Sequence, residues 1–125
     1  MTNLSILMLD NNQNFIDSAQ EFLKEQESIK EVYTTTSQSK ALRLAKEKQP
    51  HVILLDVLMP GQNGIALIPA LRENAPNAKI IMLTLWDING YRDSATKAGA
   101  DGLVGKKHML ETLIPEIEKK LSAIH

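Results

Sequence analysis

Residues 51–60 read HVILLDVLMP, a stretch in which an apolar run ends in an acid. Four apolar residues, Val52–Leu55, lead directly into Asp56, and a proline–glycine turn begins at Pro60. A continuous apolar run of this length is typical of a strand buried on both faces of a parallel sheet. Asp56 then has two interpretations: an ordinary turn residue where a strand stops, or a carboxylate placed where a ligand can reach it.

Similar runs elsewhere in the chain predict further strands. They lie at Leu4–Leu9, at Ile80–Leu83 and, in a shorter form, at Leu103-Val104. Val32–Thr36 is β-branched but polar, which indicates a strand at the edge of the sheet. Five strands are therefore expected, and most of them are apolar throughout.

Helical periodicity fills the intervals between these runs. Five helices are expected, around Phe15–Leu23, Ala41–Ala45, Ile65–Leu71, Tyr91–Ala98 and Leu110–Leu121. Asn12 is available as the cap of the first helix, while Pro69 and Pro115 predict a kink or a shorter helix in the third and fifth. Five strands that alternate with five helices predict an α/β fold, a three-layer doubly wound sandwich around a parallel sheet.

The composition narrows the class of protein without indicating a function. A chain of 125 residues suits one domain, residues 1–125, and its 15 acids and 14 bases leave a net charge of -1. This charge predicts no strong attraction to nucleic acid or membrane. The absence of cysteine excludes disulfides and thiol chemistry. No apolar run approaches the roughly 20 residues of a membrane span, and Leu4–Leu9 lacks the basic leader of a signal peptide, so a cytoplasmic location is expected.

Polar side chains follow the ends of four predicted strands. They are Asp10 and Asn11 after the first strand, Asp56 after the third, Thr84 after the fourth and Lys106 after the fifth. In an open parallel sheet, ligands bind outside the carboxyl ends of the strands, where the strand order reverses. Two carboxylates, an amide, a hydroxyl and an ammonium group suit Mg²⁺ together with a phosphoryl group. A carboxylate can also act as the nucleophile and form an aspartyl phosphate.

Each of these residues also has a plainer interpretation. Asp10 can be a cap of the first helix, and Thr84 an ordinary β-branched residue of a strand. Lys106 belongs to a Lys106-Lys107 pair, and such pairs are usually solvated surface. The functional interpretation is favoured because these four strand ends are occupied together.

Four motifs carry a resemblance to a known family: ILMLDNN, VILLDVLMPGQNG, IIMLT and KAGADGLVGK, in this order. With them, nearly the whole chain resembles the receiver domain of two-component response regulators. The resemblance implies a flavodoxin-like sheet with strand order 2-1-3-4-5. It also implies that Asp56 accepts a phosphoryl group from a phosphohistidine on a sensor histidine kinase or phosphotransfer protein.

The resemblance also implies roles for the other site residues. Asp10, Asp56 and the backbone carbonyl of Leu58 would hold Mg²⁺, and Lys106 would pair with the phosphoryl group. Thr84 would shift toward the phosphoryl group and rearrange the face formed by the fourth helix, fifth strand and fifth helix. That face would then engage a downstream effector or form a homodimer. Such a domain takes and slowly loses a phosphoryl group, so it is not expected to be an enzyme with a turnover substrate.

The sequence departs from the family pattern at three positions. Asn11 stands where receiver domains usually have a second acid, and this loss of charge predicts a weakened metal ligand. Leu103 stands where the family usually has an aromatic switch residue. The coupling between Thr84 and the output face therefore cannot use the rotation of an aromatic ring. Lys107 stands where the family often has proline, and we attach little weight to this difference.

Leu58 and Trp86 are bulky apolar residues, each two positions beyond a site residue. They predict a long-lived phosphoryl form, unless Trp86 is merely a partly exposed loop residue.

Other functions remain as alternatives. Asn11 and Leu103 favour a pseudo-receiver, a protein-interaction module that acts without phosphorylation. A phosphatase with an aspartyl-phosphate intermediate is disfavoured because Leu58 stands where such enzymes often carry a second acid. The TTTSQS stretch at 34–39 follows the second strand and lacks glycine, so it predicts a loop with a helix cap instead of a flavin-phosphate site. No room for a helix-turn-helix domain follows His125, so DNA binding by this chain is not expected.

Overall fold

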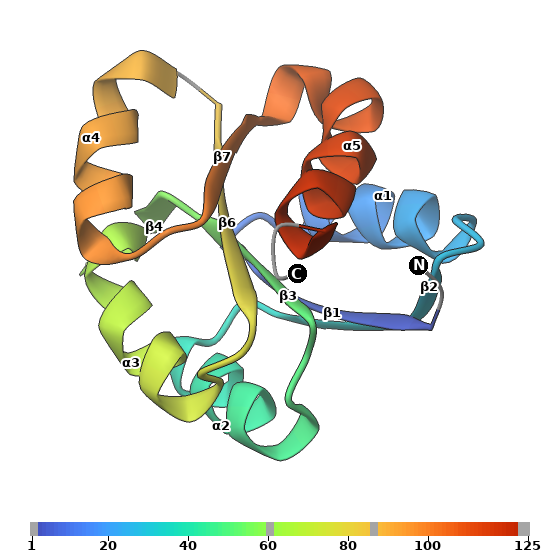
Figure 1. The fold of residues 1–125 in the computed structure, drawn as a ribbon, viewed down its shortest axis with the longest axis horizontal. Helices are drawn as coiled ribbons and strands as arrows, with labels where there is room; N and C mark the ends of the chain where they lie inside the picture. Colours follow the sequence, from blue (N-terminus) through green and yellow to red (C-terminus); the bar gives the residue numbers. More distant parts are fainter. Residues whose placement is uncertain (1–2, 60–61, 86–87, 123–125) are drawn as a thin grey trace.

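A five-stranded parallel sheet lies at the centre of the molecule (Figure 1). The structure is a computed structural model, and it describes residues 3–59, 62–85 and 88–122. The strands of the sheet are β1 (Leu4–Leu9), β2 (Ile29–Thr35), β3 (Val52–Asp56), β6 (Lys79–Thr84) and β7 (Gly102–Gly105). Their order, β2-β1-β3-β6-β7, is the predicted 2-1-3-4-5 arrangement.

Helices cover both faces of this sheet. They are α1 (Gln13–Lys24), α2 (Gln38–Lys48), α3 (Ile68–Asn74), α4 (Ile88–Ala98) and α5 (Met109–Ser122). Helices α1 and α5 lie on one face, and α2, α3 and α4 lie on the other (Figure 1). Two single 3₁₀ turns, η1 (Gly64–Leu67) and η2 (Lys106–His108), precede α3 and α5. The predicted doubly wound α/β fold is thus confirmed.

Alternating side chains of the strands form two separate cores. In β1, Ile6 and Met8 pack toward α1 and α5, whereas Leu7 and Leu9 pack toward the opposite layer. Every residue of β3 is buried. When both faces of a strand are buried, neither set of alternating side chains contacts solvent. Apolar residues therefore occupy successive positions, and the sequence of the strand is a continuous apolar run.

The edge strand and two helix caps can be compared with their predicted positions. Most side chains of β2 are exposed or half-buried, as expected for an edge, although β2 begins at Ile29, earlier than predicted. The Asn12 side chain accepts a hydrogen bond from the Phe15 N–H and caps α1. Ser37 caps α2 in the same way. The helix cap predicted in the polar stretch at 34–39 is therefore confirmed, whereas residues 34 and 35 belong to the end of β2 and not to a loop.

The two prolines in helical patterns have different consequences. Pro69 lies in the first turn of α3, where a missing N–H leaves no intrahelical bond unmade. The preceding residues form η1, so α3 is short, one of the two predicted outcomes. Pro115 lies inside α5, and the helix nevertheless continues to Ser122.

The structure also contains a small antiparallel strand pair that was not predicted. It joins β4 (Leu58–Met59) to β5 (Gln62–Asn63).

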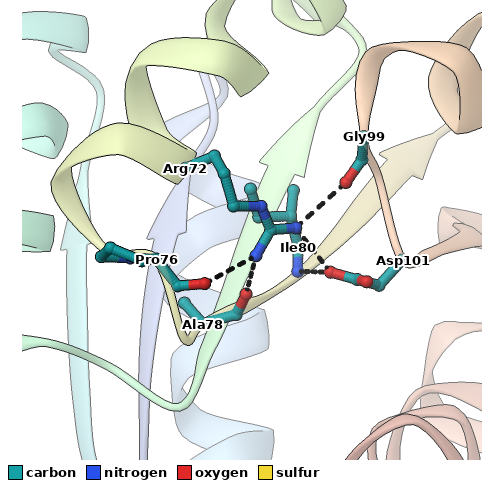
Figure 2. Close-up of polar contacts among 6 residues, drawn as sticks. All are labelled: Arg72, Pro76, Ala78, Ile80, Gly99 and Asp101. Atoms are coloured by element: carbon teal, nitrogen blue, oxygen red, sulfur yellow. Dashed lines mark hydrogen bonds and ion pairs between the residues drawn. The ribbon is translucent and has the colours of Figure 1, made fainter.

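Arg72 joins several elements at the amino ends of the strands (Figure 2). Its guanidinium group, which extends from α3, donates hydrogen bonds to the carbonyl groups of Ala78 and Gly99 and pairs with Asp101 at 2.8 Å. Asp101 in turn accepts a hydrogen bond of 2.9 Å from the N–H of Ile80. We call these residues the Arg72 clamp. It ties α3 to the start of β6 and to the segment between α4 and β7.

The two histidines within the described residues, His51 and His108, belong to no group of three or more metal-binding side chains. His51 Nδ1 lies 3.0 Å from the Ser5 N–H, a contact between the starts of β1 and β3. His108 is exposed, and His125 lies outside the described residues. Within the ranges that the structure describes, no helix has both the length and the apolar character needed to cross a membrane.

Candidate functional site

The site lies at the carboxyl edge of the sheet, where the strand order reverses. β1 pairs with β2 on one side and with β3 on the other, and its last pair with β3 joins Leu9 to Leu55. Asp10 directly follows β1, and Asp56 is the last residue of β3. Because the strands are parallel and adjacent, both carboxylates reach the same edge, which is where doubly wound sheets bind their ligands.

Lys106 brings a positive charge to both acids. Its ammonium group, which lies just past the end of β7, is 2.6 Å from Asp10 Oδ2 and 3.6 Å from Asp56 Oδ1. The Lys106 side chain is 5% exposed, that of Asp10 0% and that of Asp56 7%. Such buried charges are stable only when they compensate one another. The structure therefore brings together three residues that lie far apart in the sequence.

The two oxygens of Asp10 have different surroundings. Oδ1 accepts a hydrogen bond of 2.9 Å from the N–H of Asn12. Oδ2 is fully buried and accepts no directed hydrogen bond from the described residues, although the Lys106 ammonium group lies beside it. The charge of Oδ2 is thus compensated by Lys106, while the oxygen can still accept further bonds. A carboxylate in this situation is able to bind a metal cation.

Thr84 and Leu103 lie on the neighbouring strands. Thr84 is the last residue of β6 and is buried, and it pairs in register with Gly105, the residue before Lys106. Leu103 is buried in the core that faces α2, α3 and α4. Thr84 is therefore placed beside the strand end that carries Lys106, and Leu103 lies two residue pairs deeper in the sheet, opposite Met82.

The remaining predicted site residues are Asn11, Leu58 and Trp86. Asn11 is exposed. Leu58 lies two residues after Asp56 and begins β4. Its carbonyl group stays a predicted ligand. Trp86 lies outside the described residues. Among the described residues, no three acidic or histidine side chains gather in one place. Asp10 and Asp56 still suit Mg²⁺, which commonly takes one or two carboxylates and completes its shell with water and phosphate oxygens.

Gly64 shapes the loop beside Asp56. Its N–H donates a hydrogen bond of 2.7 Å to the Val57 carbonyl group. A Cβ atom added at this glycine would collide with the backbone carbonyl oxygen of Asp56. Gly64 is thus a residue that lets two backbone segments approach closely.

Sequence reasoning missed the role of Phe15 at this site. The Lys106 ammonium group lies 4.3 Å from the centre of the Phe15 ring. The sequence shows Phe15 only as one member of an apolar helical stripe. A possible signal was its position in the first turn of α1, directly after the DNN stretch, because a residue there lies near the carboxyl edge of the sheet.

Comparison with known proteins identifies the family of this chain. A family model described as the response regulator receiver domain matches residues 6–118. This chain belongs to the response regulator receiver domain family. The receiver domain is 27% identical over 115 residues to the transcriptional regulatory protein MctR of Rhizobium johnstonii, an alignment that covers 92% of this chain and 54% of MctR. The chain thus spans about half the length of this relative.

Solved structures show the same fold. A two-component response regulator of the LuxR family from Aurantimonas sp. SI85-9A1 superposes with a TM-score of 0.88 at 23% identity, over 98% of this chain and 87% of that one. The response regulator domain of Thermotoga maritima CheB gives a TM-score of 0.85 at 20% identity, over 96% and 97% of the two chains. The receiver domain therefore keeps its fold while most of its sequence differs.

Proposed function

We propose that this receiver domain is the phosphoacceptor of a two-component system and takes a phosphoryl group on Asp56. The observation that carries the proposal is the convergence of Asp56, Asp10 and the Lys106 ammonium group in one buried cluster at the carboxyl edge. A structural ion pair needs one acid for one base. Two acids around one lysine leave a negative charge that suits a divalent cation.

Asp56 is the proposed nucleophile. One of its carboxylate oxygens attacks the phosphorus of a phosphohistidine on a sensor kinase or phosphotransfer protein. A P–O bond forms while the P–N bond breaks, and the imidazole leaves with the electron pair of that bond. Lys106, whose ammonium group is 3.6 Å from Asp56 Oδ1, is placed to stabilise the charge of the transferred group. The domain is not proposed to turn over a substrate.

Mg²⁺ is the proposed cofactor, and Asp10 and Asp56 are its proposed side-chain ligands. When bound, it would neutralise charge on the phosphoryl oxygens during transfer. The Leu58 carbonyl group and the weakened ligand Asn11 are the further proposed donors. The buried Oδ2 atom of Asp10, which has spare acceptor capacity, supports this assignment.

The proposed output is a change at the face formed by α4, β7 and α5. A cavity of about 290 Å³ lies between these elements, and Leu103 and Ala95 are among its lining residues. Leu103 is an aliphatic residue, so the proposed switch repacks this cavity instead of rotating an aromatic ring. The relative MctR is a transcriptional regulator, which supports a cytoplasmic role with an effector domain or protein as partner, or a homodimer through this face.

Phosphorylation is tested directly by intact mass spectrometry. The protein is incubated with Mg²⁺ and acetyl phosphate, beside Asp56→Asn and a matched control, Asp93→Asn, which removes an exposed acid from α4. We expect the wild type and the Asp93 variant to gain the mass of one phosphoryl group. Because Asn cannot form the acyl phosphate, the Asp56 variant should gain nothing.

Two results would contradict this assignment. Equal labelling of the Asp56→Asn protein would place the acceptor elsewhere. No labelling of a folded wild-type protein, even at high Mg²⁺ and donor concentrations, would favour a pseudo-receiver that binds its partner without phosphorylation.

A further inference from the structure

The Phe15 ring makes an unusual contact for a side chain of an apolar helical stripe. It lies on the first turn of α1 and is half-buried, and the Lys106 ammonium group is 4.3 Å from its centre. A cation within about 6 Å of an aromatic ring centre is attracted by the negative face of the ring, and the attraction grows when water is excluded. Lys106 is 5% exposed, so this contact belongs to the stronger kind.

This contact closes a ring of four interactions. The N–H of Asn12 donates to Asp10 Oδ1, and the N–H of Phe15 donates to the Asn12 side chain. The Phe15 ring faces the Lys106 ammonium group, which lies 2.6 Å from Asp10 Oδ2. The short segment from Asp10 to Phe15 therefore holds the lysine through both a carboxylate and a ring.

The position of Lys106 is consequently asymmetric. Its ammonium group lies 2.6 Å from Asp10 but 3.6 Å from Asp56. Coulomb attraction to two carboxylates alone does not favour one over the other. The ring of Phe15 and the carboxylate of Asp10 come from the same short segment, and both contact the ammonium group.

We propose that Phe15 is a positioning residue that holds the Lys106 ammonium group against Asp10, so that Mg²⁺ must compete with Lys106 for this carboxylate. The metal part of this inference rests on the proposed function. The ring stabilises the ammonium group where it lies against Asp10, so Phe15 weakens metal binding in the unphosphorylated protein. The reduced charge at Asn11 makes this competition more effective than it would be beside a third acid.

The test measures the affinity for Mg²⁺ alone, by calorimetry, without any phosphodonor. Phe15→Leu keeps an apolar side chain and removes the ring, whereas Phe15→Tyr keeps the ring. We expect Leu to tighten Mg²⁺ binding by about three- to tenfold, the range set by a partly desolvated cation–ring contact. Tyr should leave the affinity within about twofold of the wild type, since its ring attracts a cation similarly.

A double-mutant cycle identifies the route of this effect. Lys106→Gln removes the competing cation and should tighten Mg²⁺ binding by itself. In that background, Phe15→Leu should have no further effect, because no ammonium group remains to be held. An equal effect of Phe15→Leu with and without Lys106 would overturn the proposal, since a general packing change would then be responsible.

A spectroscopic measurement keeps the contact testable apart from the metal. In proton NMR spectra, the ring current of residue 15 should displace the Lys106 ε-methylene signals in the wild type and in Phe15→Tyr, but not in Phe15→Leu. Unchanged signals in Phe15→Leu would overturn the contact itself. Mg²⁺ binding with equal affinity by all variants would overturn the role of Phe15 alone. No binding by any of them would also overturn the metal-dependent part of the proposed function.

Discussion

Gly64 shows how a single missing side chain supports the site. A Cβ atom at this position would collide with the carbonyl oxygen of Asp56, whose own side chain is the proposed nucleophile. The obstacle is backbone from the end of β3, which is anchored by pairing with β6, so neither partner can move aside easily. Any side chain at position 64 would therefore press on the backbone that carries Asp56.

Gly64→Ala should destabilise the protein by about 2 kcal/mol or more, because the added methyl group overpacks a rigid backbone contact. Urea unfolding measured by circular dichroism checks this value. Gly102→Ala is the matched control, since its added carbon would meet only flexible side-chain ends of Lys120 and Glu116 at 3.4 Å or more. A loss of stability in Gly102→Ala as large as that in Gly64→Ala would show that the collision is not the cause.

At the scale of elements, the Arg72 clamp and the site occupy opposite ends of the sheet. The clamp binds the carbonyl groups of Ala78 and Gly99, so it fixes the carboxyl end of α4 to the end of α3 and to the start of β6 (Figure 2). Arg72 and Asp101 are partly exposed, and their ion pair alone adds little stability. The larger contribution comes from the carbonyl groups that the guanidinium group satisfies.

Arg72→Met should lower the free energy of unfolding by about 1–2 kcal/mol, because carbonyl groups of Ala78 and Gly99 lose their donor. Thermal and urea unfolding both measure this loss. Arg43→Met is the control, as Arg43 is an exposed arginine of the neighbouring helix α2. Mg²⁺ affinity should stay unchanged in Arg72→Met, and a large change there would mean that the clamp and the carboxyl edge are coupled.

At the scale of the whole molecule, the parts of the fold that could be predicted are those with a strong periodic signal. β1 has the predicted bounds, Leu4–Leu9, because a strand buried on both faces is apolar throughout. The predicted start of β2, at Val32, lies after the observed start at Ile29. Lys30 and Glu31 are exposed, so this part of the strand carries no apolar signal. The β4–β5 pair was missed because strands of two residues are too short to show a period.

The site was predictable only in part for a related reason. The ends of parallel strands meet at one edge, so the strand pattern alone brings Asp10, Asp56 and Lys106 together. The contact of Phe15 with Lys106 is a tertiary contact between α1 and the residue that follows β7, which no local pattern encodes. Arg72 was missed in the same way, because its partners are backbone carbonyl groups and any residue can supply those.

Metal binding should act on the stability of the entire domain. A ligand that binds only the folded state, at about ten times its dissociation constant, adds about 1.4 kcal/mol, which is roughly 5 °C in melting temperature. Asn11→Asp should enlarge the rise caused by Mg²⁺, because a third carboxylate strengthens attraction to the cation. Differential scanning calorimetry with and without Mg²⁺, at constant ionic strength, measures this difference.

Asn14→Asp is the charge-matched control for that substitution, as it adds an exposed acid to the same end of α1. Its melting temperature should respond to Mg²⁺ as the wild type does. A response of Asn11→Asp no larger than that of Asn14→Asp would show that the amide at position 11 does not limit metal binding.

The wide spacing of Asp10, Asp56 and Lys106 along the chain has a consequence for biosynthesis. A ribosome produces both carboxylates long before their cation, because Lys106 follows the last strand of the sheet. A growing chain that ends after β6 therefore carries two acids with no ammonium group between them, and non-local strand pairing is itself slow to form. Only a chain that has been translated beyond β7 and folded can present the assembled site to a phosphodonor.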